Sequence, residues 1–389
     1  MNIFTIFYIS VIWIIYISSM PFLWFYSRKE KYKESLPARF FLKKNSSLEE
    51  SGIWFHGCSF GEIKALAPFV EALDRDKLRF STTTKTGYEE ALKYTNQTRY
   101  LPFEALLFKW LTPQKVLVVM EAEFWYLMFY FSKLKGSKNI LINARMSEKS
   151  YPKYLQYRWF YRKVFQNIDS IYAQTQEDKI RLESLGAKNI KVIGNIKFHT
   201  IQKPTKILDK PDALLVCAGS THDKEESLIL EAFRELKINK PNAKLVIAPR
   251  HPERFAKVDR IIGYYCELQK WSYKKYSISR TLSADITLID SLGELINLYA
   301  ISDIVVLGGA FEPIGGHNAS EPAQFGCSII SGEHYFNQKD IFAGVEGIKI
   351  VKNSELKDVL KYPKLLPKTK ITTKTDITPI LEEIKETLR

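Results

Sequence analysis

Three glutamates in the first third of the chain lie where a carboxylate can act on a substrate. Glu62 ends the run His56-Gly57-Cys58-Ser59-Phe60-Gly61-Glu62, and Glu121 and Glu123 follow the apolar run Val116–Met120. Glu62 either complements the dipole of the helix that follows or is a general base, held in a glycine-flanked turn that a substrate can approach. Glu121 and Glu123 either cap the next helix or belong to the same site, because charged side chains directly after a buried strand are rarely buried unless paired.

Hydroxyl, amide and basic residues occur at similar positions after other strand-like runs of this region. Such groups suit a polyhydroxylated, anionic ligand. The candidates for binding the acceptor or an acidic sugar are Ser59, Gly61, Thr84, Lys85, Asn143, Arg145, Asn195 and Lys197.

The second half of the chain combines glycines with basic residues in a pattern that suits a nucleotide. The run Ala218–His222 is predicted to link a strand to a helix start, where free N–H groups can hold a phosphate. Arg250 is placed for a bidentate contact with a phosphate or carboxylate. The loop Gly308–Asn318 has two glycine pairs and leads into a predicted helix, in which Glu321 can accept hydrogen bonds from ribose hydroxyls. The nucleotide-binding candidates are Gly219, Ser220, Thr221, His222, Pro249, Arg250, His251, Gly309, Gly315, Gly316, His317, Asn318 and Glu321.

The sequence lacks the residue spacings that mark several common classes of binding site. There is no GxxxxGK[ST] phosphate loop, and the glycine loop differs from the dinucleotide pattern GxGxxG. The six histidines show no HxxxH or HExxH spacing, and the four cysteines, Cys58, Cys217, Cys266 and Cys327, lie far apart without a CxxC pair. We therefore expect no metal, no cofactor, no disulfide framework and a reducing compartment.

These residues need a fold that brings strand ends together. Short β-branched or aromatic runs alternate with helix-like segments, which predicts parallel sheets covered by helices. In such sheets ligands bind beyond the carboxyl ends of the strands, where the candidate residues fall. The predicted strands are Gly52–His56, Arg79–Thr83, Val116–Met120, Asn139–Ile142, Ser170–Ala173 and Ile190–Ile193, then Ala213–Ala218, Ala243–Ala248, Asp285–Ile289, Asp303–Gly308 and Cys327–Ile330.

The two sets of strands predict an α/β protein with two Rossmann-like, doubly wound domains that face a central cleft. We expect an N-terminal domain over residues 28–200, a proline-containing linker over 201–212 and a C-terminal domain over 213–377. Residues 378–389 are predicted to form a closing amphipathic helix, with Thr378 as N-cap and Pro379 at its first position.

Residues 1–27 are uncharged and mostly apolar, and Arg28, Lys29, Lys31 and Lys33 follow directly. This pattern predicts an uncleaved membrane anchor with the rest of the chain in the cytoplasm. The alternative is a helix that only leans on the bilayer. The chain carries a formal net charge of +14, and the segment Tyr151–Phe165 interleaves cations with aromatic rings, so it either contacts an anionic leaflet or packs by its aromatic stripe. Without an Arg-rich tract or a nucleic-acid motif, we expect no nucleic-acid partner.

Taken together, the motifs WFHGCSFGE, MEAEFW, NARMSEKS, GNIKF, GSTH, PRHPER and GGAFEPIGGHNASEPAQFG resemble the 3-deoxy-D-manno-octulosonic acid (Kdo) transferases of Gram-negative lipid A assembly. The resemblance implies an inner-membrane GT-B glycosyltransferase that moves Kdo from CMP-Kdo to the 6′-hydroxyl of a tetraacylated lipid A precursor, with inversion and without a metal. It also implies that Glu62 is the base, that Glu121 or Glu123 takes part, and that Arg250 and the Gly315–Glu321 region bind the donor.

The chain departs from the family pattern at three positions. Cys58 replaces a small residue, Tyr126 stands where proline is usual, and His199 stands where aspartate is usual. Two other classes remain open at this stage: a GT-B transferase or epimerase that uses a UDP-sugar, and a membrane-tethered binder without turnover.

Overall fold

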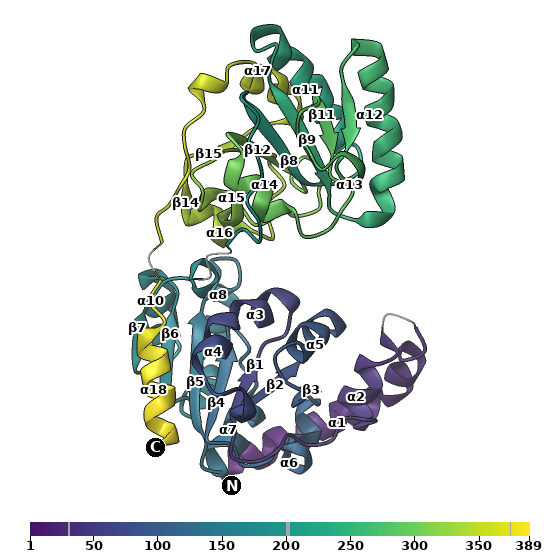
Figure 1. The fold of residues 1–389 in the computed structure, drawn as a ribbon. Helices are drawn as coiled ribbons and strands as arrows, with labels where there is room; N and C mark the ends of the chain where they lie inside the picture. Colours follow the sequence, from purple (N-terminus) through teal and green to yellow (C-terminus); the bar gives the residue numbers. More distant parts are fainter. Residues whose placement is uncertain (30–31, 200–202, 374) are drawn as a thin grey trace. The chain divides into compact units, whose positions relative to one another are not determined.

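The computed structural model describes residues 1–29, 32–199, 203–373 and 375–389. The chain divides into two compact units: unit 1 is Met1–Thr200 with Lys374–Arg389, and unit 2 is Ile201–Thr373. Each unit is a parallel sheet with helices on its faces (Figure 1). The predicted linker starts at residues 201 and 202, which lie outside the described residues. Its remainder belongs to unit 2, where the Lys206 amine pairs with Glu294 at 2.6 Å.

The sheet of unit 1 has the strand order β3-β2-β1-β4-β5-β6-β7, and its described pairs are all parallel. Side chains alternate between its two faces, as the twofold period of a strand requires. Trp54 and Leu117 therefore pack in one core, while Phe55 and Val118 pack in the other. The strands are β1 (Ile53–His56), β2 (Leu78–Thr82), β3 (Thr98–Tyr100), β4 (Val116–Met120), β5 (Lys138–Ala144), β6 (Ser170–Ala173) and β7 (Ile190–Val192).

Most helices of unit 1 connect these strands, and α18 comes from the end of the chain. The helix that the sequence predicts at Glu62 is followed at once by a second short helix: the first ends at Ala65, with Leu66 as its C-cap, and the second has Pro68 in its first turn. The helices are α1 (Ile3–Tyr26), α2 (Ser35–Phe41), α3 (Phe60–Ala65), α4 (Ala67–Ala72), α5 (Lys85–Leu92), α6 (Leu107–Trp110), α7 (Tyr126–Leu134), α8 (Tyr151–Gln156), α9 (Arg158–Phe165), α10 (Gln176–Ser184) and α18 (Thr378–Leu388).

The sheet of unit 2 has the order β10-β11-β9-β8-β12-β13-β15, again with parallel pairs. Its strands are β8 (Leu215–Thr221), β9 (Lys244–Pro249), β10 (Tyr273–Lys275), β11 (Ile286–Leu288), β12 (Ile304–Leu307), β13 (Ser328–Ser331) and β15 (Ile348–Ile350), and β14 (Val345–Glu346) pairs separately with β16 (Lys370–Ile371). The helices are α11 (Glu225–Asn239), α12 (Phe255–Gln269), α13 (Tyr276–Ser279), α14 (Leu295–Ile301), α15 (Ser320–Ala323), α16 (Lys339–Ala343) and α17 (Leu356–Lys361).

The closing helix α18 differs from its prediction at its first residues. Ile377 is the N-cap, Thr378 is already helical, and the Asp376 carboxylate accepts the Thr378 N–H at 2.9 Å. Ile380 and Ile384 are fully buried against the first sheet. The last residues of the chain therefore complete the core of unit 1.

Helix α1 is long and apolar enough to cross a membrane, with 24 residues and a mean hydropathy of 2.0. One side of it is tied to unit 1. Thr5 is fully buried and its hydroxyl lies 2.7 Å from the Tyr126 hydroxyl, and the Tyr8 hydroxyl donates to the buried Glu104 carboxylate at 2.7 Å. The other side is exposed and apolar, with Ile3 87% exposed and Phe7 64% exposed.

Candidate active site

Glu62 lies in the first turn of α3, directly beyond the carboxyl end of β1. Ser59 is the N-cap of this helix, and its hydroxyl donates to Glu62 Oε1 at 2.7 Å. The Cys58 N–H donates to Oε2 at 2.8 Å. Both interpretations of the sequence therefore find support here: the carboxylate closes the helix cap, and it is held in one orientation at the ligand-binding edge of the sheet.

Burial raises the pKa of Glu62 above its usual value, and the nearby carboxylates of Glu121 and Glu123 raise it further. A raised pKa brings a carboxylate closer to the range in which a base works well. Gly61 beside it is exposed, and a side chain added there would meet nothing within 4 Å inside the unit. The turn that carries Glu62 is thus open at Gly61.

Glu121 is held by two cations. Its oxygens lie 2.6 Å from the Lys197 amine and 3.0 Å from Arg145 Nε. Burial alone would raise the pKa of Glu121, but Lys197 and Arg145 outweigh burial and lower it. Glu121 therefore stays ionised and positions Lys197 and Arg145.

Glu123 lies on the other side of the Glu62 turn. Its Oε2 accepts the Trp125 indole N–H at 2.6 Å. Its carboxylate is grouped with His56 Nε2 and Cys58 Sγ, and the three ligand atoms lie within 4.8 Å of one another. Spacing patterns such as HxxxH detect only ligands that are close in the sequence, so they do not reveal this group.

The other polar candidates of unit 1 support the local backbone. Thr84 caps α5 and donates to the Cys58 carbonyl at 2.8 Å, and Lys85 pairs with Glu34 at 3.0 Å. The Asn143 Oδ1 accepts the Ile196 N–H at 2.9 Å, and Asn195 caps the short turn that carries Lys197. Asn143 and Glu121 both have positive φ, 53° and 56°, a conformation that costs energy for residues other than glycine and clusters at functional sites.

In unit 2, the predicted phosphate turn at residues 218–222 is different in the structure. Gly219, Ser220 and Thr221 are still part of β8, with a bulge at Ser220 (φ 56°), and α11 begins only at Glu225. The His222 and Gly309 N–H groups are not free, because both donate to the buried Glu225 carboxylate at 2.8 Å. The sequence could not show this, since Glu225 looks like an ordinary first-turn residue.

The side chains of His222, Arg250, His251 and His317 gather where backbone N–H groups were expected to hold a phosphate. His222 Nε2 and His317 Nε2 lie 2.9 Å apart. Burial lowers the pKa of His317 to about 4, and His222, Arg250 and His251 lower it further. The Arg250 side chain is exposed and forms no ion pair or hydrogen bond with the described residues. A neutral His317 ring can meet an anion through a hydrogen bond, whereas the Arg250 guanidinium meets it with a charge.

The glycine loop, Gly308–Asn318, shapes the region around His222 and His317. Gly309 has φ 75°, and a Cβ on it would lie 2.7 Å from the His317 ring. Gly315 and Gly316 also have positive φ, 120° and 82°, and pack on Asn337 and Tyr335. The loop conformation therefore requires glycine and sets the position of His317.

The remaining candidates of unit 2 have mostly structural contacts. The Thr221 hydroxyl donates to Glu226 at 2.7 Å, and Asn318 accepts the Ser320 N–H at 3.0 Å. Pro249 ends β9. The predicted helix after the glycine loop is only the four-residue α15, with Glu321 half-buried in its first turn. His317 precedes α15, so neither it nor Ser220 lies at a helix N-terminus as predicted.

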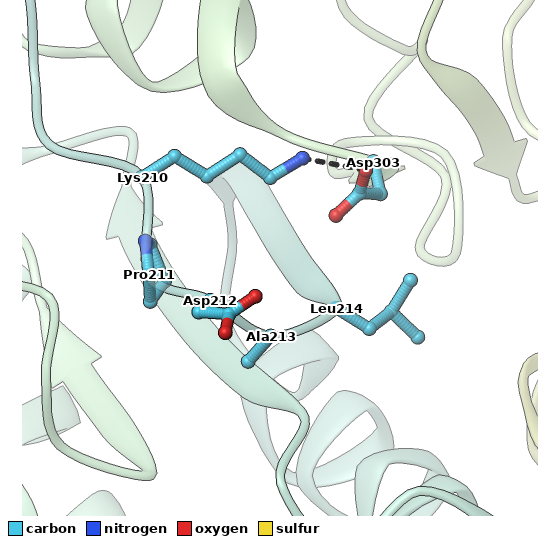
Figure 2. Close-up of a pocket in the computed structure, with 6 residues that line it drawn as sticks. All are labelled: Lys210, Pro211, Asp212, Ala213, Leu214 and Asp303. Atoms are coloured by element: carbon cyan, nitrogen blue, oxygen red, sulfur yellow. Dashed lines mark hydrogen bonds and ion pairs between the residues drawn. The ribbon is translucent and has the colours of Figure 1, made fainter.

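A cavity of about 620 Å³ lies elsewhere in unit 2. It is lined by Lys210, Pro211, Asp212, Ala213, Leu214 and Asp303, and the Lys210 amine points at the Asp303 carboxylate (Figure 2). These residues precede β8 and β12, so the cavity is at the amino ends of the strands. It is therefore separate from the candidate site at their carboxyl ends.

Two doubly wound parallel sheets with polar residues beyond their carboxyl ends define a glycosyltransferase of the GT-B class. A UDP-GlcNAc 2-epimerase from Neisseria meningitidis has a similar fold, with a TM-score of 0.50 and 13% identity over 87% of this chain and 99% of that one. The family model for 3-deoxy-D-manno-octulosonic-acid transferase matches residues 34–200, and that for glycosyl transferases group 1 matches residues 197–362.

The chain belongs to the Kdo transferase family. It is 32% identical to a 3-deoxy-D-manno-octulosonic acid transferase of Aquifex aeolicus, over 84% of this chain and 90% of that protein. It is 33% identical to a bifunctional glycosyltransferase/methyltransferase of Fusobacterium nucleatum, over 80% of this chain. The chain spans about half of that relative's length, 52%.

Two residues beside the candidate sites, Glu225 and Arg39, were not singled out from the sequence. Glu225 organises the glycine loop, and its signal, an acidic residue three positions after His222, is common at helix starts. Arg39 lies within electrostatic reach of Cys58 and Glu123, and burial lowers its pKa. Nothing in the sequence around Arg39 sets it apart from other basic residues of the chain.

Proposed function

We propose that the chain transfers Kdo from CMP-Kdo to the 6′-hydroxyl of a tetraacylated lipid A precursor, with inversion at the anomeric carbon. The observation that carries the proposal is Glu62: a carboxylate with a raised pKa, oriented by Ser59 and Cys58, at the carboxyl edge of the first sheet. Membership of the Kdo transferase family supplies the substrate class.

Glu62 accepts the proton of the attacking hydroxyl as that oxygen bonds to the anomeric carbon and the bond from that carbon to the CMP phosphate breaks. Charge develops on the departing phosphate. Arg250, His222 and His317 are the groups of unit 2 that can stabilise it, because the Arg250 guanidinium is positive and the two imidazole rings can donate N–H hydrogen bonds.

The carboxylate of the Kdo ring needs a positive partner as well. Lys197 and Arg145 suit it, because both cations are held beside Glu121, which directly follows β4. Thr84, Lys85 and Asn195 act through the backbone and neighbouring side chains, so we assign them positioning roles.

The acceptor is a lipid, and helix α1 offers the exposed apolar surface with which to reach it. We place the chain on the cytoplasmic face of the inner membrane, where the basic residues after α1 favour the anionic leaflet. Of these basic residues, Lys31 lies outside the described residues. In α9, Arg158 and Trp159 are exposed, while Val164 and Phe165 are buried, so the basic aromatic segment both packs inward and presents a surface that suits a leaflet.

The test is a product assay with purified chain, CMP-Kdo and the tetraacylated precursor, read by mass spectrometry. Glu62→Gln keeps an acceptor for the Cys58 N–H but cannot take a proton, so the rate should fall by at least ~100-fold with CMP binding intact. Glu71→Gln, an exposed carboxylate in the neighbouring helix α4, is the matched control and should leave the rate unchanged. A Glu62→Gln variant with near-normal turnover would remove Glu62 from the role.

The donor is tested separately by the melting temperature. CMP should raise it and UDP should not. A rise with UDP alone would favour a UDP-sugar transferase or epimerase, and no rise with either would contradict the nucleotide site at Arg250 and His317.

A further inference from the structure

The turn that carries Glu62 also brings together three side chains of different ligand chemistry. His56 ends β1, Cys58 follows two residues later, and Glu123 follows β4, which is paired with β1 in the sheet. One ligand atom from each lies within 4.8 Å of the other two. Adjacent parallel strands end at the same edge, and this is why residues far apart in the sequence meet here.

Two of the three ligands are held by outer partners, as in established metal sites. His56 Nδ1 lies 2.8 Å from the Ser81 hydroxyl and 3.1 Å from its carbonyl, so Nδ1 is engaged and Nε2 faces Cys58 Sγ at 3.8 Å. Trp125 fixes Glu123 through Oε2. The Ser81 carbonyl can only accept a hydrogen bond, so Nδ1 carries the ring proton and Nε2 has the lone pair that can bind an ion.

We propose that His56, Cys58 and Glu123 bind a borderline-soft divalent ion of the zinc class, and that the bound ion fixes the turn that positions Glu62. Imidazole, thiolate and carboxylate are zinc ligands, and three protein ligands leave one position for water or substrate. As sulfur bonds to the ion, the Cys58 thiol loses its proton to solvent, and no electron is transferred. The two anionic ligands then balance the charge of the ion.

The link to Glu62 passes through the backbone of Cys58. Its N–H donates to Glu62 Oε2, and its carbonyl accepts the hydroxyls of Thr82 at 2.9 Å and Thr84 at 2.8 Å. An ion on Cys58 Sγ therefore restrains the residue that orients the base. Cys58 is half-buried, whereas Cys217, Cys266 and Cys327 are buried.

The site is tested by binding, without substrate, so its failure does not depend on the transferase proposal. Purified full chain in detergent, titrated with Co²⁺, should bind one equivalent with a thiolate-to-cobalt charge-transfer band that Zn²⁺ removes. Cys58→Ala should lose the band and bind Zn²⁺ at least ~10-fold more weakly. The His222–His317 pair contains no thiolate, so an ion bound there gives no such band.

Two further variants complete the experiment. Cys266→Ala, a buried cysteine of unit 2, should keep the band. Glu123→Gln retains an acceptor for Trp125 and should keep the band while weakening Zn²⁺ binding, so the test does not rest on one variant. The proposal is overturned if the native chain shows no band, if the band survives Cys58→Ala, or if Mg²⁺, which prefers oxygen ligands, displaces Co²⁺ as well as Zn²⁺ does.

Discussion

Glu62 and Glu121 look alike in the sequence, because each lies after a strand, but their environments in the structure are opposite. Glu62 is half-buried, without a cationic partner among the described residues, and its pKa is raised, whereas Lys197 and Arg145 lower the pKa of Glu121. Titratable groups whose environments push their pKa values apart tend to have different roles in one site. Glu62 therefore suits proton transfer, and Glu121 suits holding two cations in place.

The pH profile of turnover should show the raised pKa of Glu62. A base works only when ionised, so activity should fall as the pH drops through the pKa of Glu62, and this limb should lie at a higher pH than for an ordinary glutamate. The measurement is kcat against pH, with Glu62→Gln as the variant in which the limb should vanish. An acidic limb at the usual glutamate pKa would show that burial does not perturb the base.

The raised pKa of Glu62 should also affect the free energy of unfolding. Its effect should be opposite in direction to that of the lowered pKa of an ion-paired carboxylate. A raised folded-state pKa means that ionised Glu62 destabilises the folded chain, fully so above that pKa and not at all below the usual glutamate value. Glu62→Gln should therefore melt at a higher temperature than the native chain at pH 8, and the difference should shrink towards pH 4. A lower melting temperature at pH 8 would mean that the Ser59 and Cys58 contacts outweigh burial.

Lys197→Met should destabilise the folded chain, because it removes an ion-pair partner of Glu121. Glu121 is 8% exposed, and loss of one cation leaves it poorly compensated, so unfolding should become easier by about 1–3 kcal/mol at pH 7. Its lowered pKa means that the attraction is present above the usual glutamate pKa and is lost as the pH falls through the folded-state value. Urea unfolding at pH 7 and pH 3 measures this. Lys188→Met, at an exposed position of the same unit, is the control and should change neither value.

At the scale of elements, the sequence predicts the central, buried strands of the sheets well and the edge strands β3, β10 and β15 poorly. Val116–Met120 and Ser170–Ala173 have the bounds predicted from their apolar runs. β3, β10 and β15 are three residues each and contain Arg99, Lys274 and Lys349, so they lack the apolar run that marks a strand. Pairing with a neighbour, which no local pattern encodes, makes them strands.

The candidate site shows the same limit. Residue types at strand ends correctly indicated which positions lie at the carboxyl edges, because that follows from topology. Which N–H groups are free did not follow, because Glu225 reaches Gly309 and Phe311 across the sheet edge. Partners that are distant in the sequence decide whether a backbone group is available to a ligand.

The glycine loop yields a prediction for one element. Gly309→Ala places a methyl group against the His317 ring and should weaken CMP-Kdo binding at least ~10-fold, because displacement by about 1 Å is enough to spoil a binding geometry. Gly293→Ala is a matched control: Gly293 also has positive φ, 86°, but has nothing within 4 Å of an added Cβ. Calorimetric titration of both variants separates the clash from the backbone strain, and equal losses would contradict a role for His317.

At the scale of the whole molecule, the chain begins and ends in unit 1. Helix α18 completes the core of unit 1, and α1 lies against α7 and α9, because Phe4 and Tyr8 contact Tyr126 and Tyr8 also contacts Phe160. Deleting residues 1–27 would thus remove the hydrogen bond of the buried Glu104 as well as any membrane contact. Membrane attachment is better tested by changing only the exposed side of α1.

We expect the exposed side of α1 to bind lipid. Phe7→Ser with Ile14→Ser changes two side chains, each 64% exposed and two turns apart on one face, and leaves Thr5, Tyr8 and Tyr16 in place. Burial of a large apolar side chain contributes about 1.5–3 kcal/mol, so binding to vesicles with anionic lipid should weaken at least ~10-fold in a sedimentation assay. Ile238→Ser, equally exposed in α11 of unit 2, should bind as the native chain does. Extraction with alkaline carbonate then separates the two interpretations of α1: a native chain that resists extraction supports the predicted anchor that crosses the bilayer, and a chain that is extracted supports the alternative, a helix that only leans on the bilayer.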